Sequence, residues 1–145
     1  MSRTFLLVDA HNVIFARPDL AALHRRAPGA AREALIRLLE RHQDAAGVRV
    51  VAVFDGGTKG RGDGELSGPG GIQIFYAQSA DSIIERLALK YAAKHRIVVA
   101  TNDTLVRTAA AAAGASTLDV DTLFEEIGRA DTELQGSLQK LRARR

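Results

Sequence analysis

FLLVDAHNVI, the stretch from Phe5 to Ile14, begins as an apolar run and changes character at Asp9. Together with Thr4, its first residues have the continuous apolar character of a strand buried on both faces, rather than the alternation of a half-exposed strand. Asp9, His11 and Asn12 then follow, although a strand that merely ends needs only a glycine or a proline. The presence of polar residues at this point must therefore be explained by what the rest of the chain brings to the same place.

Length and composition favour one soluble domain. The chain has 145 residues, and its 46% share of hydrophobic residues fits a globular protein with a core of its own. No apolar run approaches the roughly 20 residues of a membrane span, and the apolar stretch before Asp9 is too short for a secretory signal. With no cysteine there is neither a disulfide framework nor a thiolate metal site. We therefore expect a cytoplasmic protein without a membrane partner.

Short apolar runs alternate with helical patterns along the chain. This alternation predicts a three-layer α/β/α domain with a mainly parallel central sheet, formed by residues 1–145 as a single unit. Asp121 is the expected N-cap of the last helix, which continues into a basic tail at residues 140–145. The expected strands are 4–8, 49–54, 72–76, 96–100 and 116–118, and the expected helices are 30–46, 80–94, 105–113 and the segment from about 121 onward.

The segment from Gly56 to Gly71 contains eight of the thirteen glycines and cannot be regular structure. A loop of this length in a compact domain is usually functional or disordered. Because it follows Asp55 directly, we expect a flexible loop at the carboxyl edge of the sheet, carrying Lys59 and Arg61. Its glycines lack the spacing of a Walker phosphate loop.

Polar residues recur where the predicted strands end, which is the edge at which parallel α/β sheets bind ligands. Each acid there has an ordinary structural explanation when taken singly, such as capping a helix or favouring the positive end of its dipole. The polar residues expected at this edge are Asp9, His11 and Asn12 after the first strand, Asp55 after the second, Thr101, Asn102 and Asp103 after the fourth, and Asp81 with Glu85 on the helix from 80.

Asp9 is different, because it follows a buried strand and would be repelled by Asp55 on the neighbouring strand. Carboxylates gathered in this way are costly unless they are protonated or bound to a cation. Oxygen ligands without cysteine indicate a hard ion such as Mg²⁺ or Mn²⁺. Such a site suits phosphodiester hydrolysis, with Lys59, Arg61 and the segment 24–26 as candidates for holding a polyanion.

These residues resemble the YacP-type NYN domains, relatives of the PIN-domain ribonucleases. The family pattern Asp-Gly-Tyr-Asn-hydrophobic-Ile is matched by residues 9–14, which read Asp-Ala-His-Asn-Val-Ile. A Val-Phe-Asp strand end is matched at 53–55, an Ala-Asp helix start with an acid four residues on at 80–85, and a Thr-x-Asp motif at 101–103. The likeness extends over roughly the whole chain from Thr4.

The resemblance implies a PIN-like endoribonuclease that uses Mg²⁺ or Mn²⁺ held by Asp9, Asp81 and Asp103. It also implies that Asn12 steadies the first aspartate or contacts substrate, and that Thr101 orients the pocket through its hydroxyl. Asp55 and Glu85 would be further acids in or around the metal site, and Asn102 would contact the RNA. Whether that RNA is free or part of a larger RNA-containing particle stays open, as does the oligomeric state.

Two positions depart from the family pattern: Ala10 stands where a glycine is usual, and His11 where a tyrosine is usual. Ala10 requires a backbone without strongly positive φ. His11 could be a metal ligand, a stacking surface for a base, or a core side chain bonded to backbone, and the last is usual for a lone histidine beside an apolar run.

Two other function classes compete with the ribonuclease. A Mg²⁺-dependent phosphatase of the haloacid-dehalogenase type requires a second aspartate at the position of His11, and a receiver domain requires adjacent acids and a strand-ending lysine. A non-catalytic RNA-binding or scaffolding domain would keep the same fold without turnover. Binding of divalent ions discriminates this last alternative from a nuclease.

Overall fold

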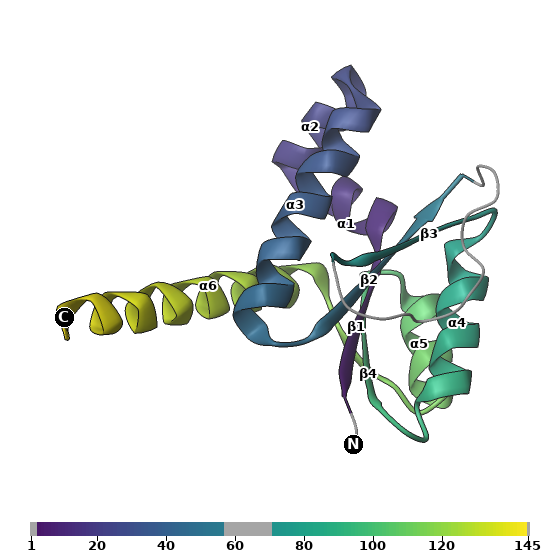
Figure 1. Ribbon diagram of the computed structural model, residues 1–145. Coiled ribbons are helices and arrows are strands. Elements are labelled where there is room, and N and C mark those ends of the chain that lie inside the picture. Colours follow the sequence, from purple (N-terminus) through teal and green to yellow (C-terminus); the bar gives the residue numbers. More distant parts are fainter. Residues whose placement is uncertain (1–2, 57–70, 145) are drawn as a thin grey trace.

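The computed structural model describes residues 3–56 and 71–144. Within these residues five parallel strands form one sheet in the order β3-β2-β1-β4-β5 (Figure 1). The central strand β1 pairs with β2 on one side and with β4 on the other, so both of its backbone edges are paired. The strands are β1 (Thr4–Asp9), β2 (Arg49–Asp55), β3 (Gln73–Ala77), β4 (Arg96–Ala100) and β5 (Ser116–Leu118).

Helices cover both faces of this sheet, which confirms the predicted three-layer fold. Successive residues of β1 point to opposite faces, so Leu6 and Val8 join one apolar core while Phe5 and Leu7 join the other. The first core is closed by α1 (Ala10–Ala16), α3 (Pro28–Ala46) and the start of α6 (Val120–Ala143), and the second by α4 (Ala80–Tyr91) and α5 (Thr104–Ala112). The helix α2 (Pro18–Arg26) lies beside α1 and α3 (Figure 1).

The segment after β1 differs from the sequence prediction. Residues 10–26 form the two helices α1 and α2, which were not expected. The helix α1 begins at Ala10, directly after Asp9, and no non-glycine residue in the described ranges has a positive φ. Ala10 can therefore replace the glycine usual at this position without backbone strain.

The helix ends also correct two details of the prediction. Asp119, not Asp121, caps α6, because its side chain accepts a hydrogen bond of 2.8 Å from the backbone N–H of Thr122. The helix α4 ends at Tyr91 rather than at residue 94, since the chain must turn there to enter β4. Gly47 ends α3 in the predicted left-handed conformation, with φ of 71°.

The C-terminal half of α6 extends away from the body of the domain (Figure 1). Only its first two turns contribute fully buried residues, Val120 and Leu123. The expected basic tail is mostly helical, because α6 continues to Ala143. Lys59 and Arg61 of the glycine-rich segment lie outside the described residues. None of the helices in the described part combines the length and hydropathy that a membrane span requires.

Candidate active site

Four aspartates gather at the carboxyl edge of the sheet, each from a different element. Asp9 ends β1 and Asp55 ends β2, while Asp81 lies in the first turn of α4 and Asp103 directly precedes α5. Their charges are close enough that the other three aspartates all raise the pKa of Asp9. The structure thus brings these sequence-predicted residues together, and we call the four the acidic cluster.

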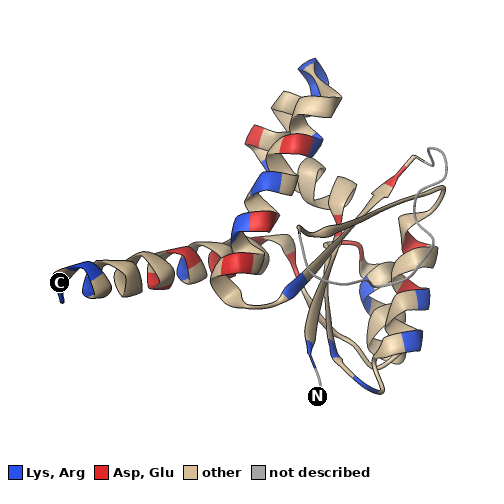
Figure 2. Ribbon diagram, in the orientation of Figure 1, with Lys and Arg blue, Asp and Glu red and all other residues tan. Residues whose placement is uncertain are grey.

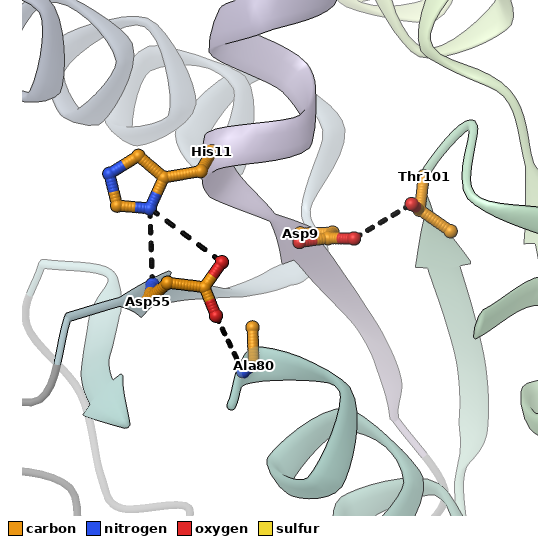
Figure 3. A network of polar contacts seen from close by, with 5 residues as sticks. All are labelled: Asp9, His11, Asp55, Ala80 and Thr101. Carbon is orange, nitrogen blue, oxygen red and sulfur yellow. Dashed lines mark hydrogen bonds and ion pairs between the residues drawn. The ribbon is translucent and has the colours of Figure 1, made fainter. Parts of the chain in front are cut away.

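Asp9 is the buried member of the acidic cluster, with 5% of its surface exposed. The hydroxyl of the fully buried Thr101 donates a hydrogen bond of 2.8 Å to its Oδ2 atom (Figure 3). The pKa of Asp9 is raised from 3.8 to about 6. Burial is the largest cause, the hydrogen bond from Thr101 opposes it, and the charges of the other three aspartates add to it. A cation beside Asp9 would offset both the cost of burying its charge and the repulsion from the other three aspartates.

Asp55 links the acidic cluster to two other elements (Figure 3). Its Oδ1 atom accepts a hydrogen bond of 2.8 Å from the backbone N–H of Ala80, the first residue of α4. Its own backbone N–H donates to Nδ1 of His11 over 3.1 Å, and its Oδ2 atom lies 4.0 Å from the same nitrogen. Asp55 therefore stabilises the N-terminus of α4, where the helix dipole favours a negative charge.

His11 is a partly buried side chain bonded to backbone, the third of the three roles that the sequence left open. Its pKa is lowered, chiefly by burial and also by its electrostatic interactions with His24 and Arg32, while Asp55 opposes the shift. The imidazole is thus neutral at physiological pH, with Nδ1 acting as the acceptor.

Asp81 and Asp103 lie at the starts of α4 and α5, close enough to interact electrostatically. Asp81 is exposed, and its pKa is raised first by partial loss of hydration, then by the charges of Asp103 and Asp55. Asp103 caps α5, since its Oδ1 atom accepts a hydrogen bond of 2.9 Å from the backbone N–H of Leu105. Glu85 lies one turn after Asp81 and lines, with it, a hollow of about 190 Å³ between α4 and α5.

Two asparagines tie the loop after β4 to its surroundings. Oδ1 of Asn12 accepts a hydrogen bond of 2.7 Å from the backbone N–H of Asn102. Oδ1 of Asn102 in turn accepts one of 2.8 Å from the backbone N–H of Val120, at the start of α6. Asn12 therefore holds the loop that carries Asp103, and Asn102 joins that loop to α6; the expected roles of Asn12 toward Asp9 or substrate stay predictions.

The donor chemistry of the acidic cluster fits Mg²⁺ or Mn²⁺, which prefer carboxylate oxygens. In residues 3–56 and 71–144, however, no three His, Asp or Glu side chains are placed so as to hold one ion together. The ligand set expected from the sequence, Asp9, Asp81 and Asp103 with Asp55 and Glu85, therefore stays a prediction.

Phe15 and His24 lie next to this site and were not identified as a pair from the sequence. Phe15 is four residues after His11, the spacing that places two side chains on one face of a helix. This signal was hidden because α1 was not expected. His24 appeared only as part of a basic segment.

A wholly parallel sheet in this strand order, with carboxylates at its carboxyl edge, defines a PIN-like α/β domain of the nuclease type. More specifically, the chain belongs to the YacP-like NYN domain family, which matches residues 6–145.

Two similar solved structures come from Bacillus subtilis. The crystal structure of Rae1 (YacP) is 27% identical to this chain, with a TM-score of 0.75, and the match covers 97% of this chain and 82% of that one. A mutant of the same protein gives a TM-score of 0.77 at 27% identity, covering 99% of this chain and 85% of that one. A comparison with curated proteins found no match.

Proposed function

We propose that this protein is an endoribonuclease that hydrolyses RNA phosphodiester bonds with the help of Mg²⁺ or Mn²⁺. The observation that carries the proposal is the buried Asp9, whose pKa is raised to about 6 by burial and by three other aspartates from separate elements. A structural role alone would favour a neutral residue in the position of Asp9, because an uncompensated buried charge lowers stability. Membership of the NYN family supports RNA as the substrate.

In this proposal Asp9, Asp81 and Asp103 hold the ion, and Asp55 and Glu85 adjust its surroundings. When bound, the ion would polarise the phosphate and lower the pKa of attacking water. Thr101 keeps one carboxylate oxygen of Asp9 oriented through its hydrogen bond. Asp103 is held from two sides, since its carboxylate caps α5 and its backbone N–H donates to Oγ1 of Thr101 over 3.0 Å. The chain thus presents oriented carboxylates at an exposed edge.

The proposal is tested by incubating the full chain with mixed short RNAs and Mn²⁺, then with EDTA, and mapping the product ends. Asp81→Asn should reduce the cleavage rate by about a hundredfold or more, because it removes a carboxylate from the metal site. Asp81 is exposed, so the variant should fold. Asp19→Asn is the matched control, since Asp19 is also an exposed acid in the first turn of a helix.

Cleavage that persists in EDTA, or an Asp81→Asn variant as fast as wild type, would contradict the proposal. A wild-type chain that binds RNA in EDTA but never cuts it would instead be a non-catalytic RNA-binding domain of the same fold.

A further inference from the structure

An exposed group of aromatic rings lies beside the acidic cluster. Phe15 has 59% of its surface exposed, although a phenylalanine is usually buried. Its ring is stacked near His11, with centroids 5.9 Å apart and planes 24° apart. His24 meets Phe15 edge to face, at 4.9 Å and 86°. We call His11, Phe15 and His24 the aromatic patch.

The aromatic patch is held in place by the fold. Val13 and Ile14 of α1 are buried in the core, while Phe15, on another side of the same helix, is exposed. Phe54 supports His11 from β2, with centroids 5.5 Å apart and planes 82° apart. The exposed ring is thus pre-oriented, so that binding a planar group to it would cost little side-chain entropy.

The aromatic patch adjoins the acidic cluster. His11 is its inner member, and its Nδ1 atom accepts the hydrogen bond from the backbone of Asp55. A planar group on Phe15 would therefore lie on the side of His11 away from its contact with Asp55, a member of the acidic cluster. That placement suits a nucleobase adjoining the bond to be cut.

Basic residues lie close to the aromatic patch. Arg25 and Arg26 follow His24 and are exposed at the end of α2, and Arg32 lies close enough to His11 to lower its pKa. Figure 2 shows basic residues at the tip formed by α2 and α3, with acidic residues on the same helices. Aromatic rings interleaved with arginines are the usual surface for single-stranded nucleic acid, in which bases stack and phosphates pair with cations.

We propose that Phe15, held in place by His11 and His24, is a base-stacking subsite for single-stranded RNA next to the acidic cluster. The inference rests on the proposed ribonuclease function and adds to it how the substrate is positioned. Because stacking reads the face of a base and not its edge, the subsite accepts unpaired nucleotides with little regard to sequence.

The test measures binding of a labelled single-stranded RNA to the full chain in EDTA, by fluorescence anisotropy, so that it does not depend on turnover. Phe15→Ala should weaken binding by roughly five- to a hundredfold, as expected for the loss of one stacked base. Phe15→Leu should weaken it similarly, because leucine keeps apolar area but lacks a π-face, whereas Phe15→Trp should bind at least as tightly as wild type. Leu89→Ala is the matched control, since Leu89 is 63% exposed on α4.

A second arm uses the same RNA with abasic positions. The wild-type protein should bind the abasic RNA more weakly than the intact RNA. The Phe15→Ala variant and the wild-type protein should bind the abasic RNA equally well. If wild type cleaves and binds RNA but Phe15→Ala and Phe15→Leu do the same equally well, the subsite is wrong while the proposed function stands. In that case the aromatic patch would be a candidate surface for binding another protein. If wild type neither binds nor cuts RNA, both proposals fall.

Discussion

Thr101 donates a hydrogen bond of 2.8 Å to Asp9, from a position 92 residues further along the chain. Both residues are buried; Asp9 ends β1, and Thr101 directly follows the neighbouring parallel strand β4. The bond joins the site's most perturbed carboxylate to the loop that carries Asp103, whose backbone N–H donates to the same hydroxyl. Thr101 therefore organises two of the proposed metal ligands at once.

Thr101→Val should lower the free energy of unfolding at pH 7.5 by about 1–3 kcal/mol, because it leaves buried polar groups without a partner. Thr101→Ser keeps the hydroxyl and should lose less than half as much. Urea unfolding followed by circular dichroism measures both. A valine variant as stable as wild type would show that the hydrogen bond does not contribute.

Asp9→Asn should stabilise the metal-free protein at pH 7.5 by up to roughly 3 kcal/mol, since its pKa is about 6 in the folded state against 3.8 ordinarily. Between these values the folded protein binds more protons than the unfolded chain, so stability falls as pH rises from about 4 to 6. The gain should therefore be present at pH 7.5 and absent at pH 4. Urea unfolding in EDTA at both pH values checks it.

Asp119→Asn provides a control of opposite sign. The pKa of Asp119 is lowered by its hydrogen bonds to Thr122, so its contribution is present at neutral pH and is lost as pH falls through that lowered pKa. This variant should be less stable than wild type at pH 7.5. Equal pH dependence in the two variants would contradict the assignment of Asp9.

Mn²⁺ should raise the thermal midpoint of the wild-type protein by several degrees at concentrations well above its Kd, because a ligand that binds only the folded state stabilises it. Asp9→Asn should abolish that rise. Glu133→Gln should leave it unchanged, because Glu133 is an exposed acid on the part of α6 beyond its buried first turns. Differential scanning fluorimetry with and without EDTA measures the effect.

His42 should make the contact between α3 and α6 sensitive to acid. It is 6% exposed, and its pKa is lowered by burial, with Glu126 on α6 opposing the shift. Because the unfolded chain binds the proton more readily, stability should fall as pH drops below about 6.5. His42→Leu should remove this part of the pH dependence, as urea unfolding at pH 5 and pH 7.5 would show. An unchanged slope between these pH values would contradict the role of His42.

His11 shows how far the sequence could go. The residue type and its place after a buried strand left three roles open, and only the fold selected one, because the partner of Nδ1 is the backbone of Asp55 on another strand. Phe15 was missed for a related reason. Its exposure depends on α1, and nothing in the short stretch between Asp9 and Pro18 distinguishes a helix from a loop that returns to the core.

The sequence by itself determined the layered α/β fold and the order of the acids, because continuous apolar runs and the residues that end them are local properties of the chain. Only the tertiary structure decided that Asn12 holds the loop after β4, and that the ring of His11 adjoins Phe54 and Asp55. These relationships depend on distances between residues far apart along the chain, which packing of the helices on the sheet sets and no local pattern encodes.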